Sequence, residues 1–394
     1  MKKTLVVAAV TGLFASVAHA QSSVTLYGLI DAGVTYANNV RSANGSGNKW
    51  SATSGNINGS RWGLRGAEDL GGGLKAIFTL ENGFNIMNGT NGQGGRMFGR
   101  QAFVGLSSSQ YGQLTLGRQY DEVVDFLGPL SLTGTGYGGT MAAHPFDNDN
   151  LSNSFRINNS VKYSSANYNG FKFGGQYGFS NSSEFGNNRA WSAGASYNFA
   201  GFNIAGAYMQ INNDLPLNAV GQPTATVSNS SGAVSGDNVI FSGRQRTFGG
   251  GINYAMGPAQ IGFVFTQSRF DDGAGVAGTS SNLGFGAHDM RFNNYEVNAR
   301  YNLTPAWNVS GQYTFTDARI NGSNIATEYN TKPKFHTVSL MTAYSLSKRT
   351  DVYLQGVYQR ESGDNSTGGA WINGVGQSST DRQVAVTAGV RHRF

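Results

Sequence analysis

Apolar and polar residues alternate with a period of two along much of the chain. In the segment 307–316 one face carries Trp, Val, Gly, Tyr and Phe, and the opposite face carries Asn, Ser, Gln and Thr. The same alternation recurs in the segments 191–199, 294–301 and 383–394. Because successive side chains of a β-strand point to opposite faces, the pattern predicts many strands, each with one apolar and one polar face.

The connections between these strands alternate in length. Seven short connections lie at 69–73, 108–112, 166–170, 199–201, 256–258, 303–305 and 347–349. Eight long connections, rich in Gly, Asn and Ser, lie near 38–58, 88–95, 121–155, 181–188, 214–242, 271–289, 320–332 and 363–380. These connections imply 16 strands, an even number, as in single-chain bacterial barrels. Short turns on the inner side of the membrane and long loops on the outer side are typical of such barrels.

The composition favours a membrane barrel over a soluble β-protein. Charged residues make up 13% of the chain, against about 25% in ordinary soluble proteins. Aromatic residues reach 12% and lie near the ends of the apolar faces, as in the aromatic girdles of membrane barrels. We therefore predict an all-β fold, a 16-stranded antiparallel transmembrane β-barrel in the outer membrane of a Gram-negative bacterium. Side chains cannot fill a barrel of this size, which predicts a water-filled channel.

The N-terminal segment has the pattern of a secretory signal peptide. Lys2 and Lys3 precede an apolar run, and the small residues Ala18 and Ala20 mark a cleavage site. The apolar run is too short to span a bilayer, so we expect the segment to be removed. The sequence therefore predicts a signal peptide at 1–20 and one barrel domain at 21–394. The chain has no cysteine, so no disulfide framework supports the barrel.

Neither the charges nor the histidines indicate a nucleic-acid-binding or catalytic protein. The formal charge is +6, but Lys and Arg are scattered rather than gathered into a patch, which argues against nucleic acid as a partner. His144, His288, His336 and His392 are far apart and have no metal-ligand spacing. No Ser/His/Asp set or paired carboxylates stand out. We expect no enzymatic activity, no cofactor and no metal.

Several longer motifs carry a family resemblance. The predicted first strand reads SVTLYG at 23–28, and a long motif, SRWGLRGAEDLGGGLKA, follows at 60–76. FGRQAFVGL at 98–106, LTLGRQ at 114–119 and the closing VRHRF at 390–394 complete the pattern. With these motifs the whole mature chain resembles the trimeric general diffusion porins of Gram-negative bacteria, in the branch typical of β-proteobacteria.

The resemblance implies a homotrimer embedded in outer-membrane lipid, with passive diffusion of ions and small hydrophilic solutes. It also implies that the third external loop, 121–155, folds into the lumen as a constriction. The loop carries several acids, of which Asp121, Asp147 and Asp149 are expected at that constriction. The terminal Phe394 resembles the assembly signal of the family.

A basic wall is expected opposite this loop. By resemblance, Arg61, Arg100 and Arg156 match the positions of a basic cluster. Arg65 and Lys162 lie on the same polar faces by parity, that is, by their odd or even position along a strand whose faces alternate. An arginine on the lipid face near the midplane costs about 2–4 kcal/mol, so arginines within strands are driven into the lumen. A cluster of this kind predicts a preference for anions.

Arg118 is left out of the predicted wall. Its parity matches that of the apolar Leu114 and Leu116, which places it on the lipid face unless a β-bulge intervenes.

Two alternative functions also stay open. The first is a substrate-selective channel with saturable affinity for one class of solute. The second is an adhesin or a hydrolase that uses the barrel as a scaffold.

Overall fold

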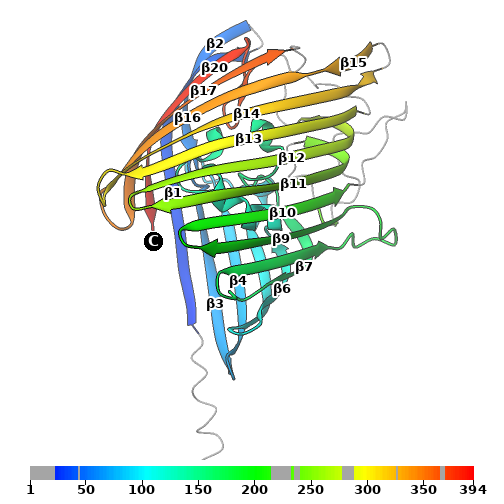
Figure 1. The fold of residues 1–394 in the computed structure, drawn as a ribbon, viewed down its shortest axis with the longest axis vertical. Coiled ribbons are helices and arrows are strands. Elements are labelled where there is room, and N and C mark those ends of the chain that lie inside the picture. The colour runs from blue at the N-terminus through cyan, green and yellow to red at the C-terminus, as the bar shows by residue number, and fades with distance from the viewer. Residues whose placement is uncertain are drawn as a thin grey trace, which may run out of the picture.

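The described strands form one antiparallel sheet that closes into a barrel (Figure 1). The computed structural model describes residues 23–42, 45–213, 232–234, 240–276, 288–324, 327–363 and 369–394. The first strand, β1 (Ser23–Ser42), closes the sheet by pairing with the last, β20 (Arg382–Arg393). Within these ranges no helix is both long and apolar enough to cross a membrane. The predicted signal peptide, 1–20, lies outside the described residues.

The other elements follow in chain order. The sheet also contains β2 (Gly45–Ser54), β3 (Arg61–Gly71), β4 (Leu74–Gly83), β5 (Gln101–Ser108), β6 (Gly112–Gln119), β7 (Ile157–Ser164), β8 (Phe171–Gly178), β9 (Arg189–Phe199), β10 (Phe202–Asn212), β11 (Ile240–Met256), β12 (Ala259–Val276), β13 (His288–Asn302), β14 (Trp307–Asn324), β15 (Thr327–Thr331), β16 (Pro333–Ser345) and β17 (Thr350–Gly363). Apart from it lie η1 (Gln93–Gly95), α2 (Glu122–Phe126), η2 (Gly128–Leu130), η3 (Thr140–Ala142), η4 (Pro145–Asp147) and the hairpin of β18 (Trp371–Ile372) and β19 (Gly376–Gln377).

The 18 described strands of the closed sheet occupy 16 positions around the barrel. β2 and β3 both pair with β1, β3 with its first half and β2 with its second half, so together they form one interrupted strand. β15 and β16 share β14 in the same way. The predicted 16-stranded antiparallel barrel is therefore confirmed.

The strands reach farther at the long-loop end than the sequence predicted. All seven short connections are found, for example Ala200 and Gly201 between β9 and β10. By contrast, β1 continues to Ser42 and β2 begins at Gly45, although 38–58 was predicted as a loop, so that boundary is wrong. Most of β2 is exposed on both faces. Its residues have no reason to alternate in polarity, and the period-two pattern gives no signal there.

The barrel wall is polar inside and apolar outside. In β14, Gln312 and Thr314 are 4% and 1% exposed, whereas the intervening Tyr313 is 44% exposed. Val104 on β5 and Leu116 on β6 likewise point outward and are more than half exposed. This is the reverse of a water-soluble barrel, and it suits a wall between lipid and an aqueous lumen.

The segment 121–155, here called the inner loop, lies within the barrel. It begins with α2, whose first turn donates two backbone hydrogen bonds to the carboxylate of Asp121, at 2.8 and 3.1 Å. Leu127 of the loop belongs to an apolar cluster with the inward-facing Met209 of β10 and Val264 of β12. Figure 1 shows the short coils of the loop between the front and rear walls of the barrel.

The last residue extends the closing seam between β1 and β20. The N–H of Gly28 donates to the carbonyl of Phe394 at 3.0 Å, and the N–H of Phe394 donates to the carbonyl of Gly28 at 3.1 Å. A Cβ atom on Gly28 would lie 2.3 Å from Cζ of the Phe394 ring. A glycine is therefore needed for the ring to lie against the first strand.

Deletion of Phe394 is expected to reduce the amount of folded barrel in the outer membrane strongly, because it removes two hydrogen bonds and an aromatic ring from the closing seam. The folded fraction is measured by the altered migration of unboiled samples on gels. Met97→Ala serves as the control, since Met97 is 59% exposed and lies between η1 and β5, away from the closing seam. An unchanged folded fraction after the deletion would contradict this expectation.

Candidate functional site

Three arginines from separate strands meet at one wall of the lumen. Arg61 begins β3, and Arg100 and Arg156 immediately precede β5 and β7. These three strands all start at the end of the barrel that carries the long loops and run toward the end with the short turns. Their first residues therefore lie at a similar level of the barrel. The arginines line one cavity of about 560 Å³, whose other side includes Gly134 and Ser152 of the inner loop. The structure thus brings together the arginines that the sequence analysis assigned to a basic wall.

Glu81 on β4 holds two of these arginines. One carboxylate oxygen, Oε1, lies 2.7 Å from Nε of Arg100, and the other, Oε2, lies 3.9 Å from Nε of Arg61. The hydroxyls of Tyr27 and Tyr120 donate to the same carboxylate at 3.0 and 3.2 Å. Hydrogen bonds that involve ionised groups are short and strong, so this set of partners fixes Arg100 firmly, whereas Arg61 is attracted to Glu81 by its charge alone.

The sequence analysis missed Glu81 and Tyr120, for different reasons. In β4 the apolar Phe78 and Leu80 alternate with Thr79 and Glu81, so parity already placed Glu81 on the lumen face. That signal was present and was not used. Tyr120 lies after the end of β6 in irregular backbone, where parity has no meaning.

Arg156 contributes a positive charge that no carboxylate offsets directly. Its guanidinium lies over the ring of Tyr120, 5.5 Å from the ring centroid. Burial, together with the like charge of Arg100, lowers the pKa of Arg156 to about 10. The side chain therefore stays charged at neutral pH. It forms no ion pair with any carboxylate in the described ranges of the chain.

A β-bulge turns Arg118 toward the inside of the barrel. The register between β6 and β7 shifts between Gly117 and Gln119, and as a result both Arg118 and Gln119 are buried. The guanidinium of Arg118 donates to the carbonyl of Gly99 at 2.7 Å and to Oδ1 of Asn158 at 2.5 Å. The bulge is the condition under which the sequence analysis admitted this residue.

Lys162 and Arg65 do not join the three arginines. Lys162 on β7 forms an ion pair with Asp125 of the inner loop and lies 3.9 Å from Oε1 of Glu122. Arg65 on β3 lies over the ring of Tyr27, 5.3 Å from its centroid. Neither residue lines the cavity that the three arginines share.

The acids expected at the constriction are not brought to the arginines either. Asp121 is fully buried and caps α2. Asp147 accepts hydrogen bonds from the backbone N–H groups of Ser152 and Ser154, at 2.9 and 3.1 Å. Asp149 is also fully buried. All three carboxylates are thus occupied with the conformation or attachment of the inner loop, which no local sequence pattern reveals.

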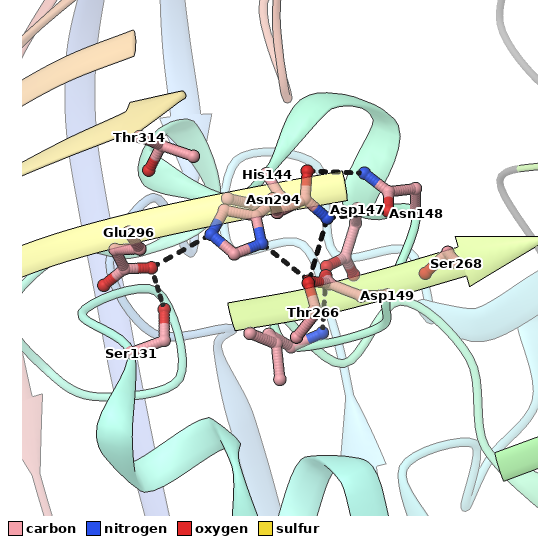
Figure 2. Close-up of polar contacts among 12 residues, drawn as sticks. Ser131, His144, Asp147, Asn148, Asp149, Thr266, Ser268, Asn294, Glu296 and Thr314 are labelled. Carbon is pink, nitrogen blue, oxygen red and sulfur yellow. Dashed lines mark hydrogen bonds and ion pairs between the residues drawn. The ribbon is translucent and has the colours of Figure 1, made fainter. Parts of the chain in front are cut away.

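His144 joins the inner loop to the barrel wall (Figure 2). Its Nδ1 lies 2.6 Å from Oδ2 of Asp149, and its Nε2 lies 3.1 Å from Oε2 of Glu296 on β13. Glu296 also accepts hydrogen bonds from the hydroxyl of Ser131 at 2.6 Å and from the N–H of Leu132 at 3.1 Å. The imidazole is completely buried between the two carboxyl groups.

Charge pairing determines the protonation state of this anchor. Burial alone would lower the pKa of His144, but the neighbouring Asp149 and Glu296 raise it to about 10. Burial would likewise raise the pKa of Asp149, yet the charge and hydrogen bond of His144 bring it below its ordinary value. At neutral pH the anchor is therefore a buried imidazolium beside a carboxylate.

Polar side chains of the wall also bind the backbone carbonyls of the inner loop. Several of these donors come from β13, β14 and the connection after β17. They are Asn298 to Leu130 at 2.9 Å, Ser310 to Tyr137 at 2.8 Å, Gln312 to Ala142 at 2.6 Å, and Asn373 to Ala143 at 3.0 Å and to His144 at 2.9 Å. These contacts attach the loop along β13, β14 and the connection after β17, Lys162 of β7 holds its first turn, and the cavity lined by the arginines lies between the loop and β3, β4 and β5.

The part of the chain that the structure describes contains no group of three or more His, Asp or Glu side chains arranged to hold a metal ion. The cavity beside the inner loop is instead lined by guanidinium, carboxylate, hydroxyl, amide and backbone groups. Such a lining can attract and guide a charged solute without forming a covalent bond to it.

The chain is similar to known bacterial porins. Residues 4–365 match the family model of the Gram-negative porins. The chain is 32% identical to an outer membrane porin protein of Bordetella pertussis and 31% identical to outer membrane porin protein 32 of Delftia acidovorans, each match covering 100% of both chains. A solved anion-selective porin from Comamonas acidovorans has a TM-score of 0.70 and 26% identity, with 95% of this chain and 100% of that chain covered.

Glu296→Ala is expected to destabilise the seated inner loop by about 3–5 kcal/mol, because a buried charge loses a partner. Ser310→Ala is the control, since it removes one neutral hydrogen bond and should cost about 1 kcal/mol. The readouts are the denaturant midpoint and the current noise of single channels. Equal effects of the two substitutions would show that the His144 anchor does not hold the loop.

The contribution of His144 is expected to be lost at high pH. Its pKa is raised from 6.5 to about 10, so the stabilisation is fully present below the ordinary pKa and falls as the pH rises through about 10. Single-channel current should become noisier over that upper range. His144→Gln cannot titrate and should lack this change; a variant with the wild-type pH profile would contradict the assignment.

Proposed function

The chain belongs to the Gram-negative porin family, and we propose that its channel conducts anions in preference to cations. The protein is a non-enzymatic channel in the outer membrane of a Gram-negative bacterium. The observation that carries the proposal is the charge balance of the cavity beside the inner loop. Its charged lining consists of Arg61, Arg100, Arg156 and Arg393 on the one hand and Glu81 and Asp125 on the other.

Both carboxylates of this lining already have cationic partners. Glu81 lies between two of the arginines, and Asp125 pairs with Lys162. Arg156 keeps its charge and has no carboxylate partner in the described ranges. A passing anion therefore meets an excess of positive charge, whereas a cation meets carboxylates that are already neutralised.

The geometry supports weak guidance of ions rather than tight binding. The side chain of Arg61 is 26% exposed, and the inner-loop edge of the cavity carries Asp125, which pairs with Lys162, among uncharged groups such as Gly134 and Ser152. Conduction requires binding that is strong enough to attract an ion and weak enough to release it. Positive charge on one side of the cavity and mostly uncharged groups on the other meet both conditions.

A similar solved structure supports the same sign of selectivity. The solved porin from Comamonas acidovorans is described as anion-selective, and its chain matches this one over nearly the whole length. We carry that property to this protein only together with the charge of its own cavity. In the same proposal, Asp121, Asp147 and Asp149 hold the inner loop in place and do not face the solute.

We further propose that the folded protein is a homotrimer that passes ions and small hydrophilic solutes. The family resemblance supports this proposal, with Phe394 as the assembly signal. Unboiled samples are expected to migrate as a trimer and boiled samples as a monomer. A protein that stays monomeric in mild detergent and still conducts normally would refute the trimer.

Replacing Arg61, Arg100 and Arg156 together by glutamine is expected to shift the reversal potential in a salt gradient toward cations. The effect should be largest at low salt, because the screening length is about 10 Å at 0.1 M and shrinks as salt rises. The measurement is the reversal potential of channels in planar bilayers. The heat-dependent gel migration of the variant is measured as well, because Glu81 loses both of its arginine partners.

The matched control for this variant removes the same net charge from outside the lumen. Arg269, Arg291 and Arg319 face away from the channel, and their replacement by glutamine should leave the reversal potential unchanged. Glu81→Gln should increase the preference for anions, because it removes a negative charge from the cavity lining. If the lumen variant and the outer variant behave alike, the three lumen arginines do not determine selectivity.

A further inference from the structure

A row of amide side chains crosses the lumen face of the wall from β9 to β14. Its members, here called the amide row, lie directly opposite one another in the register of the sheet and are Asn198, Asn203, Asn253, Gly262, Asn298 and Gln312. The row faces the lumen, since Asn253 and Asn298 are each 4% exposed, whereas the adjacent Val297 is 58% exposed on the outside. Apart from Gly262, every member is a carboxamide, which carries both hydrogen-bond donors and acceptors.

Gly262 leaves a gap in the middle of the amide row. A Cβ atom at this position would overlap the side chains of both Asn253 and Asn298. These two amides also bind the inner loop. Asn298 donates to the carbonyl of Leu130 at 2.9 Å, and the amide of Asn253 lies 3.2 Å from the same carbonyl. Attachment of the loop therefore accounts for these two amides, as it does for Gln312.

Attachment of the loop does not account for the other two amides of the row. Within the described ranges, neither Asn198 nor Asn203 forms a hydrogen bond through its side chain. Oδ1 of Asn203 is buried as well, although it has no donor there. Buried polar groups in native proteins nearly always have a partner, so an unpaired amide beside a cavity points to a ligand or to water.

Arg300 adds a positive charge beside the amide row. It lies two residues beyond Asn298 on the same face of β13, opposite Gln260 of β12. Its guanidinium lies over the ring of Tyr137 in the inner loop, 4.9 Å from the ring centroid. The guanidinium forms no ion pair and no hydrogen bond with the part of the chain that the structure describes. Because stacking on a ring leaves the N–H groups in the guanidinium plane unused, Arg300 keeps free donors as well as its charge.

These groups line one cavity of about 540 Å³ between the wall and the inner loop. Among the described residues of the lining, Arg300 is the only charged one. The other polar side chains of the lining are Ser131, Thr135, Tyr137, Asn198, Asn203, Asn253, Gln260 and Asn298. Pro129 and Thr135 also line the cavity of the three arginines, so the two cavities adjoin along the inner loop. Ala200 and Gly201 of a short turn belong to the lining too, which places this cavity nearer the inner mouth of the channel.

We propose that this cavity binds sugar acids, which are small solutes with several hydroxyls and one carboxylate. A hydroxyl both donates and accepts, as a carboxamide does, so the row can bind neighbouring hydroxyls of one molecule. The free guanidinium donors of Arg300 match the two oxygens of a carboxylate. The cavity is also within the range of about 300–1,000 Å³ that is usual for small-molecule sites. The proposal rests on the proposed anion-conducting channel, because the solute reaches this cavity past Arg61, Arg100 and Arg156.

A neutral sugar and a simple carboxylate would each satisfy only part of the site. A sugar without a carboxylate leaves the charge of Arg300 without a partner. A carboxylate without hydroxyls leaves Asn198 and Asn203 unpaired. A comparison of the three kinds of solute therefore distinguishes a sugar-acid site from a general attraction of anions, for which a simple carboxylate would serve equally well.

The test measures the block of single-channel current in planar bilayers that contain the full-length folded protein. Glucuronate, glucose and acetate are titrated separately at constant salt, and their half-blocking concentrations are compared. The site variants are Arg300→Gln and the double variant Asn198→Ala with Asn203→Ala. The control variants are Arg65→Gln and Gln113→Ala, since neither residue lines the cavity. Arg65 is a close match to Arg300, because its guanidinium also lies over a tyrosine ring.

Glucuronate is expected to block wild type at a concentration about tenfold lower than glucose or acetate, because it alone uses both Arg300 and the amides. Arg300→Gln should raise the half-blocking concentration of glucuronate about tenfold. The double amide variant should raise it about threefold, since neutral hydrogen bonds contribute less. Both control variants should behave as wild type does. All variants should keep the heat-dependent gel migration of wild type, which separates loss of binding from misfolding.

Equal block by glucuronate and acetate would overturn the proposal, because charge alone would then explain the effect. An unchanged half-blocking concentration in Arg300→Gln, or an equal loss in Arg65→Gln, would overturn it as well. The reversal potential of wild type in a potassium chloride gradient is recorded in the same membranes. A preference for cations would refute the proposed function, whereas a lack of block in a channel that prefers anions would refute the sugar-acid site alone.

Discussion

A strand wall surrounded by lipid must direct its apolar side chains outward, and this constraint determines what the interior can be. The backbone N–H and C=O groups of the wall form hydrogen bonds with neighbouring strands, so none of them faces the lipid without a partner. Every second side chain then faces the lumen, and most of these are polar, as in β14. A segment that lies in the lumen is held by polar contacts together with apolar clusters such as that of Leu127 with Met209 and Val264, and a solute that crosses the lumen meets polar groups.

The inner loop uses this interior in two ways. On one side it is bound by amides, hydroxyls and the buried pair of His144 with Asp149 and Glu296. A buried charge of this kind is tolerated because its partners are buried with it. Beside β3, β4 and β5 the loop leaves a cavity in which Glu81 holds Arg100 and pairs with Arg61. The position in which the loop is attached therefore sets the width of this cavity.

Much of the barrel could be predicted from the sequence, because its strands repeat a simple local pattern. Alternation and turn spacing predicted the strand number and the wall, and parity with family motifs selected Arg61, Arg100 and Arg156. The same parity failed for Arg118, since a bulge shifts the register by one residue. The buried roles of Asp147 and Asp149 were beyond local patterns, because their partners are set by the folded loop and, for Asp149, by residues more than 100 positions away.

The attachment points of the inner loop also bear on the order in which the molecule can assemble. Glu296, Gln312 and Asn373 all follow the loop in the chain, the last by about 230 residues. Contacts between distant parts of a chain form only after the loop entropy between them has been lost. The loop cannot be seated while the later strands are still being added. A nascent barrel must therefore pass through a wide-bore state, and its permeability is narrowed only as the last strands arrive.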